Sequence, residues 1–166
     1  MHYLTRRWVA RYCKGTTGAG VSGAVIYRYQ RACEVVSPRS RPDSFANWMQ
    51  QQDETCISSL TRTEFRCLLA RRQRMQLLTS VQVQEIYAKF QQDCQDGHLL
   101  HYAVSDQHVL NAGLMIESLP AIALRTLDAL HLSVVHEISA KTLATADKVM
   151  AQAAKLLEIK VIWFGE

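Results

Sequence analysis

Residues 124–148 have the sequence LRTLDALHLSVVHEISAKTLATADK. Apolar side chains recur there at intervals of three and four residues, which predicts a helix from about Leu124 to Ile138. The pattern then changes to a short run typical of a strand, over Thr142–Ala146. Asp147 follows directly and is expected to begin a second helix, which runs through Leu157. Helices and strands in such close succession are typical of a domain built from alternating elements.

The alternation continues on both sides of this stretch. Downstream, a final strand is predicted over Lys160–Phe164. Upstream, the predicted elements are the end of a helix at Phe45–Met49, a strand at Thr55–Ser58, a helix that a capping box at Thr61–Glu64 opens and that ends at Arg74, a helix from about Ser80 to Cys94, a strand near Leu99–Val104, and a helix capped by Ser105-Asp106. Strands that alternate with helices predict an α/β domain with a mostly parallel sheet, covered by helices on both faces.

The composition fits one soluble domain. The chain has 166 residues, of which 48% are apolar and 20% are charged, so it is able to bury a full core. No stretch approaches the roughly 18 consecutive apolar residues of a membrane span, so no membrane association is expected. The five cysteines are scattered, and none forms a Cys-x-x-Cys pair that would indicate a zinc site. A reducing compartment, the cytoplasm, is therefore expected.

The charge is unevenly distributed along the chain. Residues 1–42 contain eight Arg or Lys and one acid, whereas residues 43–166 contain eleven bases and fourteen acids. We therefore divide the chain into an atypical basic N-terminal segment, 1–43, expected to be poorly ordered, and an α/β domain, 44–166. Two alternatives for Arg6–Lys14, which mixes bases with aromatic residues, are a nucleic-acid contact and a mitochondrial transit peptide.

Three acids lie where helices are predicted to follow strands or to begin. Glu64 and Asp147 each come just after a predicted strand, and Asp128 lies early in an apolar helix. In parallel sheets the functional crevice lies beyond the carboxyl ends of the strands, which is where such residues meet. Each acid also has a structural alternative: Glu64 and Asp147 as helix caps, and Asp128 as the partner of a neighbouring Arg125 or His131.

Three segments that contain these acids resemble the PIN domain. They are Ser58–Phe65 (SSLTRTEF), Leu124–Leu132 (LRTLDALHL) and Thr142–Lys148 (TLATADK). The likeness is strongest to the VapC-like toxin ribonucleases of bacterial toxin–antitoxin systems, and it covers about residues 44–164. The resemblance implies a PIN-like three-layer fold with a mostly parallel sheet flanked by helices.

The resemblance also implies a site and an activity. Glu64, Asp128 and Asp147 would bind Mg²⁺ or Mn²⁺ and form the catalytic centre, with Thr145 holding a carboxylate or water from behind. Thr145 has the alternative of simply packing through its methyl group at a strand end. The expected reaction is metal-dependent endonucleolytic cleavage of RNA. The expected partners are an RNA substrate, a cognate antitoxin protein and, from the family, a second copy in a homodimer.

The sequence departs from the family at its N-terminal side. The family carries an aspartate at the end of its first strand, and Met1–Leu4 is similar to the start of that strand, but Thr5 and two arginines follow it. No aspartate precedes Asp43, and the spacing supports neither Asp43 nor Asp106 as a replacement. The alternative function is therefore a catalytically inactive PIN-like module that only engages an antitoxin or RNA. A disturbed reading frame would explain residues 5–42, a hypothesis that translating the other two frames of the gene tests.

Overall fold

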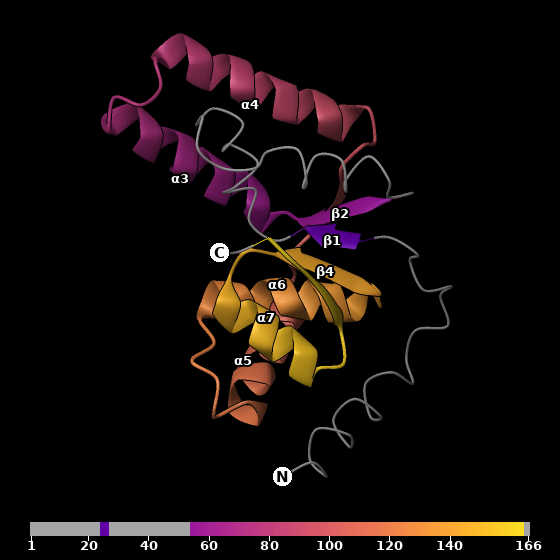
Figure 1. Ribbon diagram of the computed structural model, residues 1–166. Coiled ribbons are helices and arrows are strands. Elements are labelled where there is room, and N and C mark those ends of the chain that lie inside the picture. The colour runs from indigo at the N-terminus through magenta and orange to yellow at the C-terminus, as the bar shows by residue number, and fades with distance from the viewer. Residues whose placement is uncertain (1–23, 27–53, 165–166) are drawn as a thin grey trace.

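The computed structural model describes residues 24–26 and 54–164, and these contain a five-stranded parallel sheet (Figure 1). The strands are β1 (Ala24–Ile26), β2 (Thr55–Ser58), β3 (Leu100–Tyr102), β4 (Thr142–Thr145) and β5 (Lys160–Trp163). Their order across the sheet is β3-β2-β1-β4-β5, and every neighbouring pair runs parallel. The predicted α/β fold with a parallel sheet is thereby confirmed.

Helices cover both faces of this sheet, as Figure 1 shows. They are α3 (Leu60–Arg74), α4 (Ser80–Gln95), α5 (Asp106–Ser118), α6 (Thr126–Glu137) and α7 (Lys148–Leu156). Neighbouring residues of a strand point to opposite faces, so Ile57 packs with α3 and α4 while Cys56 packs with α5, α6 and α7. The result is three layers with one apolar core on each side of the sheet. Within residues 54–164, no helix combines the length and the apolar character that crossing a membrane requires.

The central strand β1 was not predicted. The sequence places a first strand at Met1–Leu4, whereas the structure pairs Ala24–Ile26 with both β2 and β4. A central strand is covered on both faces and so lacks the polar–apolar alternation that marks a half-buried strand. Three residues within a Gly- and Arg-rich segment carry too short a pattern to detect. Met1–Leu4 and the helix end predicted at Phe45–Met49 lie outside the described residues.

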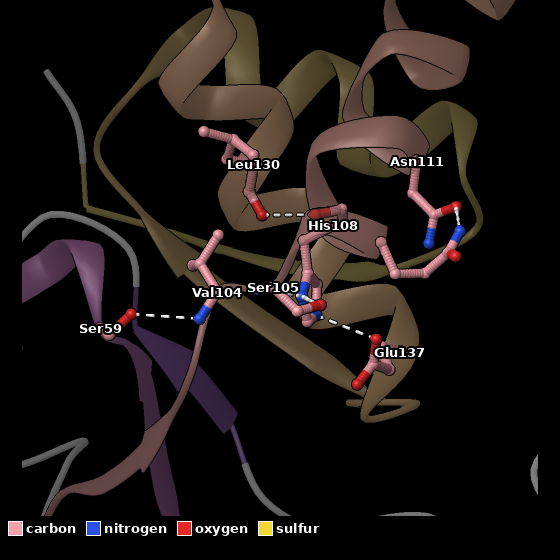
Figure 2. Close-up of polar contacts among 9 residues, drawn as sticks. Ser59, Val104, Ser105, His108, Asn111, Leu130 and Glu137 are labelled. Atoms are coloured by element: carbon pink, nitrogen blue, oxygen red, sulfur yellow. Dashed lines mark hydrogen bonds and ion pairs between the residues drawn. The ribbon is translucent and has the colours of Figure 1, made fainter.

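The other predicted elements are found within one or two residues of their expected ends, but the start of α3 differs. The predicted capping box at Thr61–Glu64 is wrong, because α3 already begins at Leu60 with Ser59 at the N-cap position. Thr61 is fully buried within the helix. The hydroxyl of Ser59 instead accepts a hydrogen bond from the Val104 N–H at 3.1 Å, which ties α3 to the loop after β3 (Figure 2). Glu64 consequently lies in the second turn of α3.

The sheet order defines one functional edge. The chain leaves the carboxyl ends of β2 and β4 to enter α3 and α7, and the strand order reverses at β1, between them. The helix α6 leads into β4 through the short connection 138–141, so the first turn of α6 lies at the same carboxyl edge. Ligands of open parallel sheets bind at such a reversal of strand order.

Candidate functional site

The three predicted acids all come from chain segments at this carboxyl edge. Glu64 lies in the second turn of α3 after β2, Asp128 lies in the first turn of α6, and Asp147 is the N-cap of α7 after β4. The topology therefore brings segments that are far apart in sequence to the same end of the sheet. That the three acids form one site stays a prediction.

Asp128 is the most deeply buried of the three, with 1% of its surface exposed. Its helix is apolar, and its neighbours Ala129 and Leu132 belong to the core on the α5–α7 side of the sheet. Moving a carboxylate out of water is costly unless hydrogen bonds, an opposite charge or a metal ion compensate it. A carboxylate at this position therefore needs such compensation, whereas a surface aspartate is stabilised by water.

Asp147 caps α7, as the structural alternative for this residue expected. Its Oδ1 atom accepts hydrogen bonds from the backbone N–H groups of Val149 at 2.9 Å and Met150 at 3.0 Å. The buried hydroxyl of Thr145 accepts a hydrogen bond from the Asp147 N–H at 3.0 Å. Thr145 thus fixes the backbone from which the Asp147 carboxylate projects. The cap occupies Oδ1, and a carboxylate offers about four acceptor sites on its two oxygens.

Glu64 contacts His131, a residue of α6 on the other side of the sheet edge. The Nε2 atom of His131 lies 3.0 Å from Glu64 Oε2, and its Nδ1 atom lies 2.9 Å from the hydroxyl oxygen of Ser58 at the end of β2. Ser58 and His131 are both 1% exposed, and the Glu64 side chain is 14% exposed. His131, named above as an alternative partner of Asp128, thus lies beside the carboxylate of Glu64, a contact that the sequence did not predict.

The donor chemistry of the three acids fits a hard divalent cation, because Mg²⁺ and Mn²⁺ prefer carboxylate and water oxygens. Among residues 24–26 and 54–164, however, no three His, Cys, Asp or Glu side chains are grouped so that they hold a metal ion. Glu64 is turned toward His131 and Asp147 toward its own helix. The ligand set of Glu64, Asp128 and Asp147 therefore stays a prediction.

The missing acid of the first strand has no replacement in β1. The strand Ala24–Ile26 is followed in the sequence by Tyr27-Arg28-Tyr29, and none of these residues is acidic. Asp106 is exposed in the first turn of α5. The strand at the centre of the sheet therefore contributes no carboxylate to the edge where the three acids lie.

A second serine–histidine–glutamate contact lies at α5 (Figure 2). The Nδ1 atom of the buried His108 is 2.8 Å from the Ser105 hydroxyl and accepts a hydrogen bond from the Ser105 N–H at 3.0 Å. Its Nε2 atom lies 3.0 Å from Glu137 Oε2, but the two are not aligned as a hydrogen bond. We therefore describe it as a close contact between the two side chains and not as a hydrogen bond. It caps α5 and joins it to α6.

The cysteines near the sheet are not activated nucleophiles. Burial is the largest factor that raises the pKa of the Cys56 thiol to about 11, followed by the nearby Glu54 charge. Cys94 Sγ lies 3.1 Å from His101 Nε2. Burial raises the pKa of Cys94 and lowers that of His101, so both groups are held in their neutral forms near neutral pH.

Sequence reasoning did not identify Ser58 as a site residue and left the role of His131 open. The signal for His131 is its position three residues after Asp128, which places both on one face of α6. Ser58 is separated from His131 by 73 residues, and Glu64 by 67. No local pattern reports contacts over such separations.

A comparison with known protein families agrees with the α/β fold described above. The sequence matches the model of one protein family, described as the PIN domain, over residues 32–156. The matched range contains Ser58, Glu64, Asp128, His131 and Asp147. No curated protein matches the chain.

Proposed function

This chain belongs to the PIN domain family, and from that membership we propose that it is a metal-dependent endoribonuclease that cleaves RNA phosphodiester bonds. Members of the family are generally nucleases that use divalent metal ions and act on RNA. The proposal adds the metal requirement, the residues and the activity of this particular chain.

One observation carries the proposal: the three family-like acids all lie on the N-terminal portions of helices at the carboxyl edge of a single parallel sheet. Glu64, Asp128 and Asp147 lie within the first two turns or at the N-cap of α3, α6 and α7. Helix N-termini carry partial positive charge, so they favour carboxylates and also the phosphates of an approaching nucleic acid. The edge therefore combines metal-binding oxygens with groups that attract phosphate.

The roles of the residues follow from their positions. When bound, Mg²⁺ or Mn²⁺ supplies a nucleophilic water of lowered pKa and neutralises charge on the attacked phosphate. Glu64, Asp128 and Asp147 would hold that ion through carboxylate oxygens. Asp147 reaches the site from a cap that Thr145 orients, since the Thr145 hydroxyl accepts from the Asp147 N–H. The burial of Asp128 keeps water away from its carboxylate and would strengthen its interaction with a cation.

Metal removal is the first test of this function. We expect purified protein to cleave a mixed single-stranded RNA in Mg²⁺ or Mn²⁺, to lose cleavage in excess EDTA and to regain it when Mn²⁺ is restored. The physical reason is that a divalent metal ion lowers the pKa of its bound water and neutralises charge on the attacked phosphate, and negatively charged carboxylates cannot supply that neutralisation. Cleavage that persists unchanged in EDTA after dialysis would contradict metal dependence. A gel assay with end-labelled RNA measures all three conditions.

Substitutions of Asp147 distinguish its role as a helix cap from its proposed role as a metal ligand. Asparagine and aspartate are about equally good N-cap residues, whereas alanine costs about 0.5–2 kcal/mol. We expect Asp147→Asn to keep the unfolding free energy within about 0.5 kcal/mol and yet lower Mn²⁺ affinity and cleavage, because an amide is a weaker metal ligand. Asp147→Ala should lose both stability and cleavage. Urea unfolding and isothermal titration with Mn²⁺ measure the two effects, and full activity in Asp147→Asn would remove this residue from the ligand set.

We further propose that the enzyme is a toxin-type ribonuclease of the cytoplasm, held inactive by a cognate antitoxin protein, and that it forms a homodimer. The support is the likeness of Ser58–Phe65, Leu124–Leu132 and Thr142–Lys148 to the VapC-like branch. Arrest of bacterial growth on expression, absent in a cleavage-deficient variant, is the expected result. Sedimentation of the purified protein tests the dimer.

A second function is favoured by one observation, the absence of an acid in and directly after β1. A PIN domain that lacks one carboxylate would bind metal more weakly and act as a binding module for an antitoxin or RNA. The metal test distinguishes the two functions: a well-folded protein that binds RNA and cleaves none in any Mn²⁺ concentration would establish the binding module.

A further inference from the structure

We propose that His131 is a positioning residue for Glu64: its Nε2–H group holds one oxygen of the Glu64 carboxylate, and Ser58 holds the imidazole, so that the other oxygen is presented to a metal ion. The metal-binding part of this inference rests on the proposed function. The hydrogen-bond part stands on the geometry alone.

The geometry is that of a three-membered relay across the edge of the sheet. Ser58 ends β2, Glu64 lies in α3 on one face, and His131 lies in α6 on the opposite face. The two nitrogen–oxygen distances are 2.9 and 3.0 Å, both within the range of good hydrogen bonds. The imidazole is thus fixed at both ends, and through it α6 holds the side chain of a residue of α3.

The positions of the protons follow from the partners. An ionised carboxylate only accepts hydrogen bonds, so the proton of the pair between His131 and Glu64 belongs to Nε2. In the neutral imidazole Nδ1 is then an acceptor, and the Ser58 hydroxyl donates to it. The Glu64 carboxylate therefore sets the tautomer, and the Ser58 hydroxyl, which is able to donate or accept, holds the ring in place at Nδ1. The opposite tautomer would direct a lone pair at the carboxylate.

A carboxylate held this way is better prepared for a metal than a mobile one. The bond to His131 occupies Oε2 and stops rotation of the group, while Oε1 keeps its acceptor sites. Hydrogen bonds that orient ligands of a metal typically contribute 10–100-fold to metal affinity or activity. The 14% exposure of the Glu64 side chain leaves part of it accessible, whereas His131 itself is 1% exposed and is not placed to touch a substrate.

The test uses Mn²⁺ itself as the probe, with binding followed by electron paramagnetic resonance of the free ion. We expect His131→Leu to weaken Mn²⁺ binding by about 10–100-fold. His131→Gln, which keeps an N–H donor near the position of Nε2, should recover most of that loss. Ser58→Ala should give an intermediate loss, because the imidazole keeps its contact with Glu64 and loses the hydrogen bond that fixes its other end. Rescue by glutamine is a readout that a role in packing alone would not produce.

His108 provides a matched control, since it is also buried between a serine hydroxyl and a glutamate. Its glutamate, Glu137, is 47% exposed at the end of α6 and lies away from the candidate ligands. His108→Leu should lower stability and leave Mn²⁺ affinity unchanged. Mn²⁺ affinity that falls equally in His108→Leu and His131→Leu would assign both effects to packing and overturn the inference.

The outcomes separate this inference from the proposed function. If the wild-type protein binds Mn²⁺, and Glu64→Gln weakens that binding while His131→Leu does not, the inference fails and the nuclease proposal stands. If the wild-type protein binds no Mn²⁺, both fail. Should His131→Leu not fold, Ser58→Ala decides: an affinity equal to that of the wild type would refute the positioning role.

A second measurement needs no metal. Long-range ¹H–¹⁵N correlation spectra of the metal-free protein report which ring nitrogen of His131 carries a proton. A proton on Nε2 is expected, and Glu64→Gln, which removes the acceptor-only carboxylate, should increase the share of the other tautomer. A wild-type His131 with a proton on Nδ1 and none on Nε2 would overturn the inference, whatever the outcome of the metal experiments.

Discussion

Asp128→Asn should lower the rate of RNA cleavage by more than about 100-fold while the fold is retained. Changes to groups that merely orient metal ligands already cost about 10–100-fold, and Asp128 is proposed as a ligand itself. The substitution keeps the size of the side chain and removes its negative charge. A divalent cation at a buried position requires that negative charge. Initial rates with end-labelled RNA in saturating Mn²⁺ measure the effect, and circular dichroism checks the fold.

Asp106 is the matched control for this experiment. It also lies in the first turn of a helix that follows a strand, but it is exposed to solvent. Asp106→Asn should therefore leave cleavage within about twofold of the wild type, because Asp106 is not a proposed metal ligand and surface substitutions usually change the free energy of unfolding by no more than about 0.5 kcal/mol. Equal cleavage by the wild type and Asp128→Asn would exclude Asp128 from catalysis. A large loss in Asp106→Asn would instead make it the carboxylate that replaces the missing acid.

Phe65→Ala should destabilise the protein by about 3–5 kcal/mol, the usual cost of deleting a buried aromatic ring. Phe65 follows Glu64 directly and is 1% exposed. Its ring centroid lies 4.9 Å from that of Phe90 and 6.2 Å from that of Tyr87, so it joins α3 to α4. Such aromatic contacts contribute about 0.5–1.5 kcal/mol beyond the burial of apolar surface. Urea unfolding followed by tryptophan fluorescence measures the loss.

Two further substitutions make the result specific. Phe65→Leu keeps most of the buried volume and should cost clearly less than alanine, while Val81→Ala removes an exposed apolar side chain of α4 and should be nearly neutral. A loss below about 1 kcal/mol in Phe65→Ala would mean that α3 and α4 do not depend on this ring for their packing.

The sequence predicts most elements because their patterns are local. The helices α4, α6 and α7 carry apolar side chains at helical spacing. The strands β2 (TCIS) and β4 (TLAT) each hold two apolar residues between polar ones. Asp147 is a good example of a position that local chemistry specifies, since a helix that begins after a strand needs an N-cap and aspartate is among the best. The structure shows that cap with two hydrogen bonds.

The features that sequence reasoning missed depend on more than local pattern. The expected capping box at Thr61 and Glu64 does not form, because the Glu64 side chain contacts His131 and Thr61 is buried in the core. Both environments are set by the packing of α3 on the sheet. The strand β1 is missed because three residues give no periodicity. Its central place is known only when the partners on both sides are known.

That central place has a consequence for how the chain folds as it is made. Ile26 of β1 pairs with Ala144 of β4, so the ribosome must add about 120 more residues before the pairing is able to form. At roughly 5–20 residues per second this takes on the order of 6–24 s. Until then the nascent chain carries an unpaired edge on β1, and the two halves of the sheet remain unjoined. Assembly of the sheet is therefore expected to be a late, slow step that closes only after β4 emerges, because pairings between distant residues carry the largest entropic barrier.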